Sequence, residues 1–425
     1  MYLAIIEPHE ALFRYLEVAK RKGYQTFVVT SDVESSKKDE EKYNLSIRGS
    51  HVCRMDKFVI CDVGDPKSVL DALTPLKKQI AGIVAGHEIF VPLVAEVGAA
   101  LGFDYAKRED ATCQQLKTAM KQRLMDRGVR TARFTVCSEL DEAMRAWHNF
   151  GQDCIVKMVN FVGSMNVFRV RSQEDLTTAW DIIINDRRGV KTPFPRLLQV
   201  IVEEYISGRE LSAEGYVQNG RVVVLNSCEK ITGPNFVVVG HLLPSQLSPQ
   251  EKAKLEEIAA ECVLALGVHN AVFHAEVHIM NGVPYVIECA SRPPGLHVAE
   301  LISRSYNIDL MEISIDLATG KKVTVSPRAP HLHYAMMALY AQQTGTLKKI
   351  EGLDELQARG GALRIHLGVK EGDKVDALST FRNKCGFAIL EDATPEGVRE
   401  KAAWLQANVH FEVDSTMTEP VSAVS

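Results

Sequence analysis

The sequence predicts an α/β and α+β protein that opens with a parallel sheet and continues with antiparallel lobes. Its 425 residues are too many for one ordinary hydrophobic core. Up to about residue 105, short apolar runs alternate with helical patterns, which is typical of an open parallel α/β sheet. Beyond Ala111, strands follow one another around hairpin signals such as Asn219-Gly220.

Four strands and three helices are expected in the first part. The apolar runs that predict the strands cover residues 3–6, 26–30, 57–60 and 82–85. The helical patterns cover residues 11–23, 65–76 and 90–102. EPHEA follows the first strand in place of G-x-G-x-x-G. A dinucleotide-binding fold that holds NAD is therefore disfavoured.

The middle of the chain is expected to mix helices with antiparallel strands. Helices are predicted over 111–128 with a stop at Gly128, between VRTARFTV (129–136) and residue 153, and over 248–266. Strands and hairpins are predicted over 153–170, 197–227, 271–279 and 283–290. The segment 325–415 looks like a separate small lobe, and residues 416–425 are expected to be a disordered tail.

Composition excludes several classes of protein. The 49 basic and 54 acidic residues are interspersed and give a net charge of −5, so no nucleic-acid or membrane-binding patch is expected. Nine cysteines without any C-x-x-C pair indicate reduced thiols rather than a disulfide frame or zinc site. MYLAIIEPHE lacks a basic stretch and a long apolar core, so no signal peptide is expected, and no window reaches the length of a membrane span. The expected compartment is the cytoplasm.

Glu276 and Glu288 are the first candidate site residues. They lie on two predicted strands joined at Asn281-Gly282. Two neighbouring carboxylates repel unless a cation lies between them, and Mg²⁺ favours such oxygen ligands. A plain two-residue turn would pair Glu276 with Ile287 and separate the carboxylates, whereas a longer loop or a bulge would pair it with Glu288. The alternative is two solvated glutamates at strand ends.

Two lysines are candidates for phosphate contacts. Lys157 closes the strand CIVK and precedes NFVGSMNV, whose Gly163-Ser164 tip can offer backbone N–H groups to phosphate oxygens. An ordinary hairpin tip with a solvated lysine is the alternative. Lys117 stands on the helix 111–128 and, taken alone, would be a surface lysine.

The stretch VIVEEYISGRE at 200–210 resembles a nucleotide hinge. An apolar strand runs into Glu203, Glu204, Tyr205 and Ile206, and Glu210 follows a turn. Backbone groups there can contact an adenine edge while a carboxylate accepts ribose hydroxyls. A strand, a turn and exposed glutamates are the plainer interpretation.

The order of these signals resembles the ATP-grasp superfamily. Four motifs follow one another along the chain: a lysine-bearing helix, V-K with a glycine loop, E-E-Y-x-x-G-x-E and E…E-x-x-x-R. The resemblance covers roughly residues 1–410, in the domain order of the biotin-carboxylase-like subgroup. It implies a pre-ATP-grasp domain (1–108), a small lid subdomain (109–200), a large subdomain with the metal site (201–324) and a C-terminal lobe (325–415).

The resemblance also implies a role for each motif. Lys117 and Lys157 match the lysines that contact the nucleotide phosphates, and the backbone of Glu204 and Ile206 would bind adenine. Glu210 matches the ribose acid, and Glu276 and Glu288 match the ligands of one or two Mg²⁺ ions, with Mn²⁺ as an alternative. Glu203, Tyr205, Gly163 and Ser164 complete the expected ATP site.

The stretch VIECASRPPG departs from the commonest pattern, E-x-N-x-R. Ala290 stands at the usual asparagine ligand and cannot bind a metal. Variants without that asparagine resemble the L-amino acid ligase branch, which makes dipeptides. Arg292 would bind the reacting carboxylate, since its fork can hold a carboxylate bidentately. Leu296 and His297 are expected to line the acid pocket.

The implied reaction is amide formation between an amino acid, or a similar acid, and an amine. The acid would first be phosphorylated by ATP, and the amine would then displace phosphate. His241 and His274 are candidates for the proton transfer, although both lie on apolar strands where core histidines are common. Alternatives are a purine-pathway or carboxylating enzyme and a catalytically inactive nucleotide-binding protein. Related enzymes are often dimers, so a homodimer is one expectation.

Overall fold

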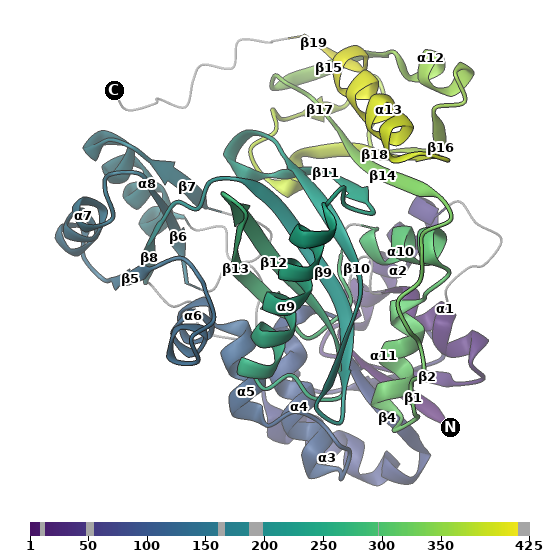
Figure 1. Cartoon of the computed structure of the whole chain (residues 1–425). Coiled ribbons are helices and arrows are strands. Elements are labelled where there is room, and N and C mark those ends of the chain that lie inside the picture. The colour runs from purple at the N-terminus through teal and green to yellow at the C-terminus, as the bar shows by residue number, and fades with distance from the viewer. Residues whose placement is uncertain (9–12, 48–54, 160–165, 187–198, 296, 415–425) are drawn as a thin grey trace.

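The structure is a computed structural model that describes residues 1–8, 13–47, 55–159, 166–186, 199–295 and 297–414. Figure 1 shows a central sheet with the N-terminal domain beneath it, a lid to one side and the C-terminal lobe above. Among the described residues, the strands form four sheets. The tail 416–425 lies outside the described residues.

The N-terminal domain is the open parallel sheet that the sequence predicts. Its strand order is β3-β2-β1-β4, and every pairing is parallel. All four strands are confirmed, and one helix (α2) was not anticipated from the sequence. The elements are β1 (Tyr2–Ile6), α1 (Arg14–Arg21), β2 (Gln25–Thr30), α2 (Val33–Ile47), β3 (Lys57–Ile60), α3 (Pro66–Leu73), η2 (Thr74–Gln79), β4 (Ile80–Ala85), η3 (Glu88–Phe90) and α4 (Val91–Ala100).

The single helix expected over 111–128 is wrong. The chain forms α5 (Arg108–Gln115) and α6 (Lys117–Asp126), with Leu116 extended between them at φ −89° and ψ 109°. No glycine or proline marks this break. Tertiary contacts impose it, because Gln114 donates to the Leu266 carbonyl at 3.1 Å and holds α5 in place. Lys117 therefore starts a helix instead of lying inside one.

The lid is a four-stranded antiparallel sheet with its own core. Its strand order is β5-β8-β6-β7, and the hairpin expected over 153–170 is confirmed by the pairing of β6 with β7. Buried side chains from the strands and both helices, including Trp147 and Trp180, form one apolar cluster. The elements are β5 (Phe134–Cys137), α7 (Leu140–Asn149), β6 (Cys154–Met158), β7 (Val167–Val170), α8 (Gln173–Asn185) and β8 (Val200–Glu204).

The central sheet has the strand order β13-β12-β9-β10-β11-β14-β18-β16 in the part of the chain that is described. The hairpin at Asn219-Gly220 is confirmed, since Gln218 pairs with Arg221. Helix α9 packs on one face, and α10 and α11 pack on the opposite face (Figure 1). The elements up to α11 are β9 (Arg209–Gln218), β10 (Arg221–Thr232), η4 (Pro234–Phe236), β11 (Val238–Leu243), α9 (Pro249–Ala265), β12 (Ala271–Met280), β13 (Val283–Ala290), α10 (Val298–Tyr306) and α11 (Leu310–Ala318).

The last segment does not form a sheet wholly of its own. Three of its strands (β14, β18 and β16) extend the central sheet, because β11 pairs with β14 through hydrogen bonds. Only β17, β15 and β19 make a separate small sheet. The elements are β14 (His333–Tyr340), β15 (Gly345–Glu351), α12 (Leu353–Ala358), β16 (Ala362–Leu367), β17 (Lys374–Val375), η5 (Phe381–Asn383), β18 (Lys384–Asp392), α13 (Pro395–Asn408) and β19 (His410–Asp414).

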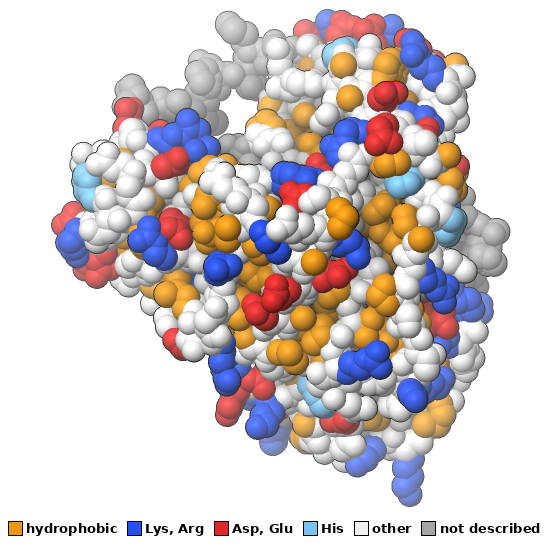
Figure 2. Space-filling model, in the orientation of Figure 1, with side chains coloured by type: hydrophobic (Ala, Val, Ile, Leu, Met, Phe, Trp, Pro, Cys, Tyr) orange, Lys and Arg blue, Asp and Glu red, His pale blue; other side chains and the backbone are white. Residues whose placement is uncertain are grey.

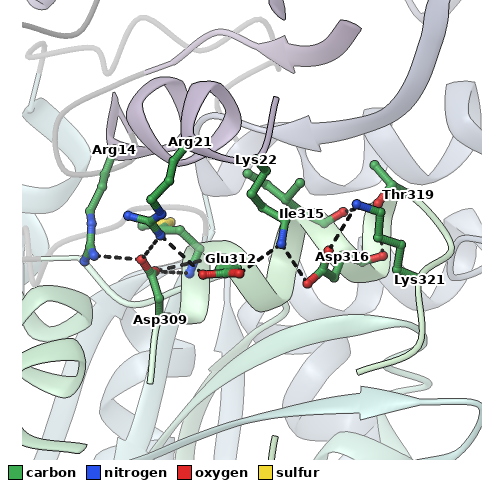
Figure 3. Close-up of polar contacts among 10 residues, drawn as sticks. Arg14, Arg21, Lys22, Asp309, Glu312, Ile315, Asp316, Thr319 and Lys321 are labelled. Atoms are coloured by element: carbon green, nitrogen blue, oxygen red, sulfur yellow. Dashed lines mark hydrogen bonds and ion pairs between the residues drawn. The ribbon is translucent and has the colours of Figure 1, made fainter. Parts of the chain in front are cut away.

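A cluster of ion pairs docks the N-terminal domain onto the large subdomain (Figure 3). Basic side chains of α1 face acidic side chains at the start and along one side of α11. Asp309 accepts from Arg14 at 2.8 Å and from Arg21 at 2.7 Å. Lys22 bridges Glu312 and Asp316, with both distances 3.0 Å. The N-terminal sheet is thereby held beside the central sheet.

The face of the molecule shown in Figure 2 carries mixed charge, with Lys and Arg side chains interspersed with Asp and Glu. Within the described residues, no helix has both the length and the apolar character needed to cross a bilayer.

Candidate active site

The two candidate metal carboxylates face one another on the central sheet. The turn at Asn281-Gly282 is the short one, since Met280 pairs with Val283. A bulge at Ile287 then shifts the register, so that Glu276 pairs with Glu288. The register that the metal hypothesis requires is confirmed, and a bulge produces it. Bulges of this kind re-aim side chains next to functional sites.

The predicted nucleotide residues line one cleft between the lid and the central sheet. The cleft has a volume of about 820 Å³, which includes its open mouth. Every described residue that the sequence assigned to ATP or metal belongs to its lining: Lys117, Lys157, Glu203, Glu204, Tyr205, Ile206, Glu210, Glu276 and Glu288. Gly163 and Ser164 lie outside the described residues. The remaining lining, mostly apolar, was missed by sequence reasoning and consists of Ala132, Ile155, Met158, Val167, Phe236, His278 and Ile287.

The break at Leu116 gives Lys117 its position. The amine Nζ of Lys117 donates to Oε1 of Glu288 at 2.9 Å. Burial lowers the pKa of Lys117, but attraction to Glu288 and Glu88 outweighs burial, and the net pKa lies above its usual value. A permanent positive charge therefore stands beside one of the two carboxylates.

Glu203 lies between two buried lysines. Its carboxylate forms ion pairs with Lys121, at 2.7 Å, and with Lys157. Burial raises the pKa of Glu203, but the two lysines lower it further, to about 2. Burial also lowers the pKa of Lys121 from its usual value. Sequence reasoning had no role for Lys121, because its position on a helix next to other charges looks like a solvated face.

The hinge strand places its backbone at the cleft. The Glu204 carboxylate is held by Arg133, whose backbone N–H donates at 3.0 Å and whose Nε donates at 2.8 Å. His278 Nδ1 lies 2.9 Å from the Ile206 carbonyl oxygen. The guanidinium of Arg169 stacks 3.6 Å from the centre of the Tyr205 ring. One side-chain partner thus anchors each of the three hinge residues.

A row of alternating charges crosses the central sheet beside the metal carboxylates. Lys230 contacts Glu276 at 2.6 Å and Glu210 at 3.2 Å. His274 lies between Glu276, at 3.2 Å, and the fully buried Glu214, at 2.8 Å. Burial lowers the pKa of His274, but the two carboxylates outweigh it and raise the pKa to about 9. This geometry favours an orienting role for His274 and counts against its predicted role as a proton acceptor.

His241 differs from His274 in its surroundings. It is 3% exposed and stands opposite Lys230 on the neighbouring strand. Burial, aided by repulsion from Lys230 and Lys384, lowers the pKa of His241 well below its usual value. Within the described structure, its Nδ1 has no hydrogen-bond partner. A neutral imidazole with a free nitrogen can accept a proton.

Arg292 pairs with a residue that the sequence reasoning did not consider. Its Nε donates to Oε2 of Glu88 at 3.0 Å, its second amino group contacts the same oxygen, and a third bond goes to the Pro293 carbonyl at 2.8 Å. Burial raises the pKa of Glu88, but Arg292 and Lys117 lower it below its usual value. Glu88 follows β4 at the carboxyl end of a parallel sheet, which is a typical ligand position. The position of Glu88 directly after a predicted parallel strand was the signal in the sequence that could have identified it as a site residue.

His297 lies at the start of α10, away from the nucleotide cleft. Its backbone is left-handed, with φ 63°, and its ring lies 4.1 Å from the ring of Phe387. Leu296, the other residue expected in the acid pocket, lies outside the described residues. His297 therefore contacts the C-terminal lobe.

The residues present fit a divalent cation at Glu276 and Glu288. Their side chains are about one quarter exposed, and each contacts a lysine amine, Lys230 for Glu276 and Lys117 for Glu288. Among the described residues, no group of three or more His, Cys, Asp or Glu side chains forms a complete metal site. Two carboxylates that share their remaining positions with phosphate oxygens suit Mg²⁺.

Comparison with known proteins identifies two domains. Residues 150–300 match the ATP-grasp domain, and residues 337–414 match the L-amino acid ligase C-terminal domain 2. The chain is 23% identical to the uncharacterized protein y4rH of Sinorhizobium fredii over 73% of this chain and 64% of that protein. It is 22% identical to an alanine–anticapsin ligase of Bacillus subtilis over 66% of this chain and 71% of that enzyme.

A solved structure shares the whole arrangement. The L-amino acid ligase from Bacillus licheniformis superposes with a TM-score of 0.75 at 20% identity, covering 97% of this chain and 98% of that one. At this identity the likeness shows the fold. Residues 150–300 therefore carry an ATP-grasp domain, and residues 337–414 carry the C-terminal domain 2 of the L-amino acid ligases.

Proposed function

We propose that the protein is an ATP-dependent ligase that joins the carboxylate of an amino acid, or a similar acid, to an amine. The observation that supports this most is the bulge that sets Glu276 opposite Glu288 in a cleft shared with Lys117 and Lys157. The matched C-terminal domain of L-amino acid ligases favours an amino acid among the substrates.

ATP would lie along the cleft with its base at the hinge. Apolar side chains such as Ile155 and Ile206 offer a dry surface for adenine, and Glu210 stands where a ribose could donate its hydroxyls. The phosphates would reach Lys117 and Lys157, whose amines now contact carboxylates. These lysines would exchange part of those contacts for phosphate oxygens.

Glu276 and Glu288 would hold Mg²⁺, with Mn²⁺ as an alternative metal. When bound, the ion would neutralise charge that develops on the phosphate oxygens. Ala290 adds no ligand, so phosphate oxygens would complete the coordination sphere. The number of ions, one or two, belongs to the same proposal.

In the first step, a carboxylate oxygen of the acid attacks the γ-phosphorus of ATP. The bond from that phosphorus to the ADP oxygen breaks, which yields an acyl phosphate and ADP. Arg292 would bind the attacking carboxylate, and its fork is already oriented by Glu88 and the Pro293 carbonyl. Orientation and fixed positive charge are the main contributions that a protein makes to such a transfer.

In the second step, the amine nitrogen attacks the acyl carbon and inorganic phosphate leaves. The nitrogen must lose a proton, and His241 is the proposed acceptor because its Nδ1 has no hydrogen-bond partner among the described residues. Burial lowers the pKa of His241 and keeps its imidazole neutral but a weak base, and His241 does not line the nucleotide cleft itself. His274 instead stays between its two carboxylates and orients Glu276.

The test is phosphate release from Mg-ATP across a matrix of acid–amine pairs, with single acids as controls. Phosphate that appears only with particular pairs, together with an amide of the expected mass, would support the ligase and name its substrates. ATP binding without phosphate release for any pair would instead favour a non-catalytic nucleotide-binding protein. A cytoplasmic location and a homodimer remain parts of the proposal, to be checked by fractionation and light scattering.

A further inference from the structure

Four side chains connect the C-terminal lobe to the loop that carries Arg292. We name them the joint cluster: His297 and Glu300 at the start of α10, Arg364 on β16 and Phe387 on β18. His297 and Glu300 come just after the reacting loop, and the other two lie within the matched C-terminal domain. Figure 1 shows α10 directly below β14 and β16.

The joint cluster is tied by charge and by ring contacts. Arg364 donates to Glu300 at 2.6 Å, and its guanidinium lies 5.3 Å from the centre of the Phe387 ring. His297 contacts the same two residues: the centre of its ring lies 4.1 Å from the centre of the Phe387 ring, and its Nδ1 lies 3.3 Å from Oε2 of Glu300. The side chains of Arg364 and Glu300 are 18% and 19% exposed. Removing one partner of an ion pair this shielded from water has a larger effect than removing one partner of an open surface pair.

His297 needs this support because of its backbone. Its φ of 63° lies in the left-handed region, which is unfavourable for residues other than glycine. No side chain caps α10 at this position. Strained residues of this kind persist where their surroundings hold them, and they cluster at functional sites. Phe387 and Glu300 supply the contacts that hold His297.

The start of α10 is linked to the Arg292 loop by a backbone hydrogen bond, because the Val298 N–H donates to the Gly295 carbonyl at 3.0 Å. Pro293 and Pro294 follow Arg292 directly, and each proline ring fixes one backbone angle. The Arg292 guanidinium also donates to the Pro293 carbonyl at 2.8 Å, so the proline and the side chain are linked. A shift at His297 would therefore move the group expected to bind the acid.

We propose that Arg364 and Phe387 are positioning residues through which the C-terminal lobe sets the acid-binding loop. The proposal rests on the ligase function proposed above for its kinetic consequence, but the positioning itself can be observed without activity. The competing explanation is that the joint cluster is only a structural contact between domains. Such a contact would stabilise the fold without a selective effect on binding of the acid.

The first experiment measures amide hydrogen exchange in the protein without substrates. In Arg364→Ala, we expect exchange to rise at least threefold in peptides that cover Val298 to Tyr306 and in peptides that cover Ser291 to Gly295, with other peptides unchanged. The matched control is Arg359→Ala in the same lobe. Arg359 also combines an ion pair, to Glu355 at 2.8 Å, with a ring contact, 4.9 Å from Trp404. The control should leave the α10 peptides unchanged.

The second experiment is kinetic. The lost charge-assisted hydrogen bond joins Arg364 to Glu300 and not to the acid, so only part of its value of about 10-fold to 100-fold should reach the acid, and Arg364→Ala should raise KM for the acid by about 10-fold. The Kd for ATP should stay within about twofold, and Arg364→Lys should restore part of the loss. Phe387→Leu serves as a second variant if Arg364→Ala is unstable.

The outcomes separate the two proposals. Unchanged α10 exchange in Arg364→Ala, or equal loss of acid and ATP binding, would overturn the positioning role. A selective rise of exchange that includes the Ser291–Gly295 peptides would support that role even if no acid–amine pair releases phosphate, whereas a rise confined to α10 would show only a structural contact and would overturn it. In that case only the ligase function would fail.

Discussion

Replacing Glu203 with glutamine should destabilise the lid by about 3 kcal/mol at pH 7. The folded pKa of Glu203 is about 2, against an ordinary value of 4.5, because the carboxylate pairs with Lys121 and Lys157. A tenfold change in an acid dissociation constant corresponds to about 1.4 kcal/mol, so ionised Glu203 contributes about 3 kcal/mol. Removing one partner of a buried ion pair typically has a cost of about 3–5 kcal/mol, which agrees.

The pH dependence has a definite sign. The folded pKa lies below the unfolded one, so the contribution of Glu203 is complete above pH 4.5 and is lost as the pH falls toward 2. The difference in unfolding free energy between the parent protein and Glu203→Gln should therefore shrink from about 3 kcal/mol at pH 7 to about 1 kcal/mol near pH 3.

Tryptophan fluorescence can isolate the lid. Two of the three tryptophans, Trp147 and Trp180, belong to the lid core, and Trp404 lies on α13. Urea unfolding in a Trp404→Phe background would then report the lid alone. The matched control is Glu204→Gln, since Glu204 pairs with an arginine that is 62% exposed and should contribute less than about 1 kcal/mol. A loss below about 1 kcal/mol for Glu203→Gln, or a loss that does not vary with pH, would refute the reasoning.

Three predictions concern the chemistry. Glu288→Gln should abolish ADP formation while the thermal midpoint changes little; turnover that survives in a coupled assay would remove Glu288 from the metal site. Arg292→Ala should lower kcat/KM for the acid by at least about 100-fold with ATP affinity retained, and a collapse of ATP binding by calorimetry would make Arg292 a nucleotide residue instead. His241→Asn should slow amide formation, yet hydroxylamine should still trap the acyl phosphate at the parental rate; equal loss of both would contradict a role confined to proton transfer.

Local sequence signals predicted the parts of the fold that depend on local chemistry. The four parallel strands follow from apolar runs, and the hairpin at Asn219-Gly220 follows from its turn residues. The helix predicted over 248–266 is confirmed as α9, and the structure adds a capping box at Ser248. The pairing of Glu276 with Glu288 followed from a functional requirement placed on the register. Each of these features is determined by residues that are close in sequence or by the pairing of two adjacent strands.

Features imposed by distant contacts could not be predicted in this way. The break at Leu116 depends on Gln114, which bonds to a carbonyl 152 residues away. Glu88 became a site residue only when the N-terminal domain docked near Arg292. Lys121 looks like a surface lysine on a helix but is 1% exposed, because Glu203 lies over it. Such pairings are properties of the assembled domains.

The continuous central sheet determines where this protein can be divided. Strands β14, β18 and β16 belong to the same sheet as β12 and β13, which carry Glu276 and Glu288. A chimera joined at residue 325 would therefore combine strands from two proteins within one continuous sheet. Among the described residues, the lid shares no strand with the central sheet, and its buried side chains form a hydrophobic cluster of their own. Exchange between relatives should therefore succeed at the ends of the lid, near residues 133 and 205. The two sides of the cleft are therefore separate structural units, each with its own sheet.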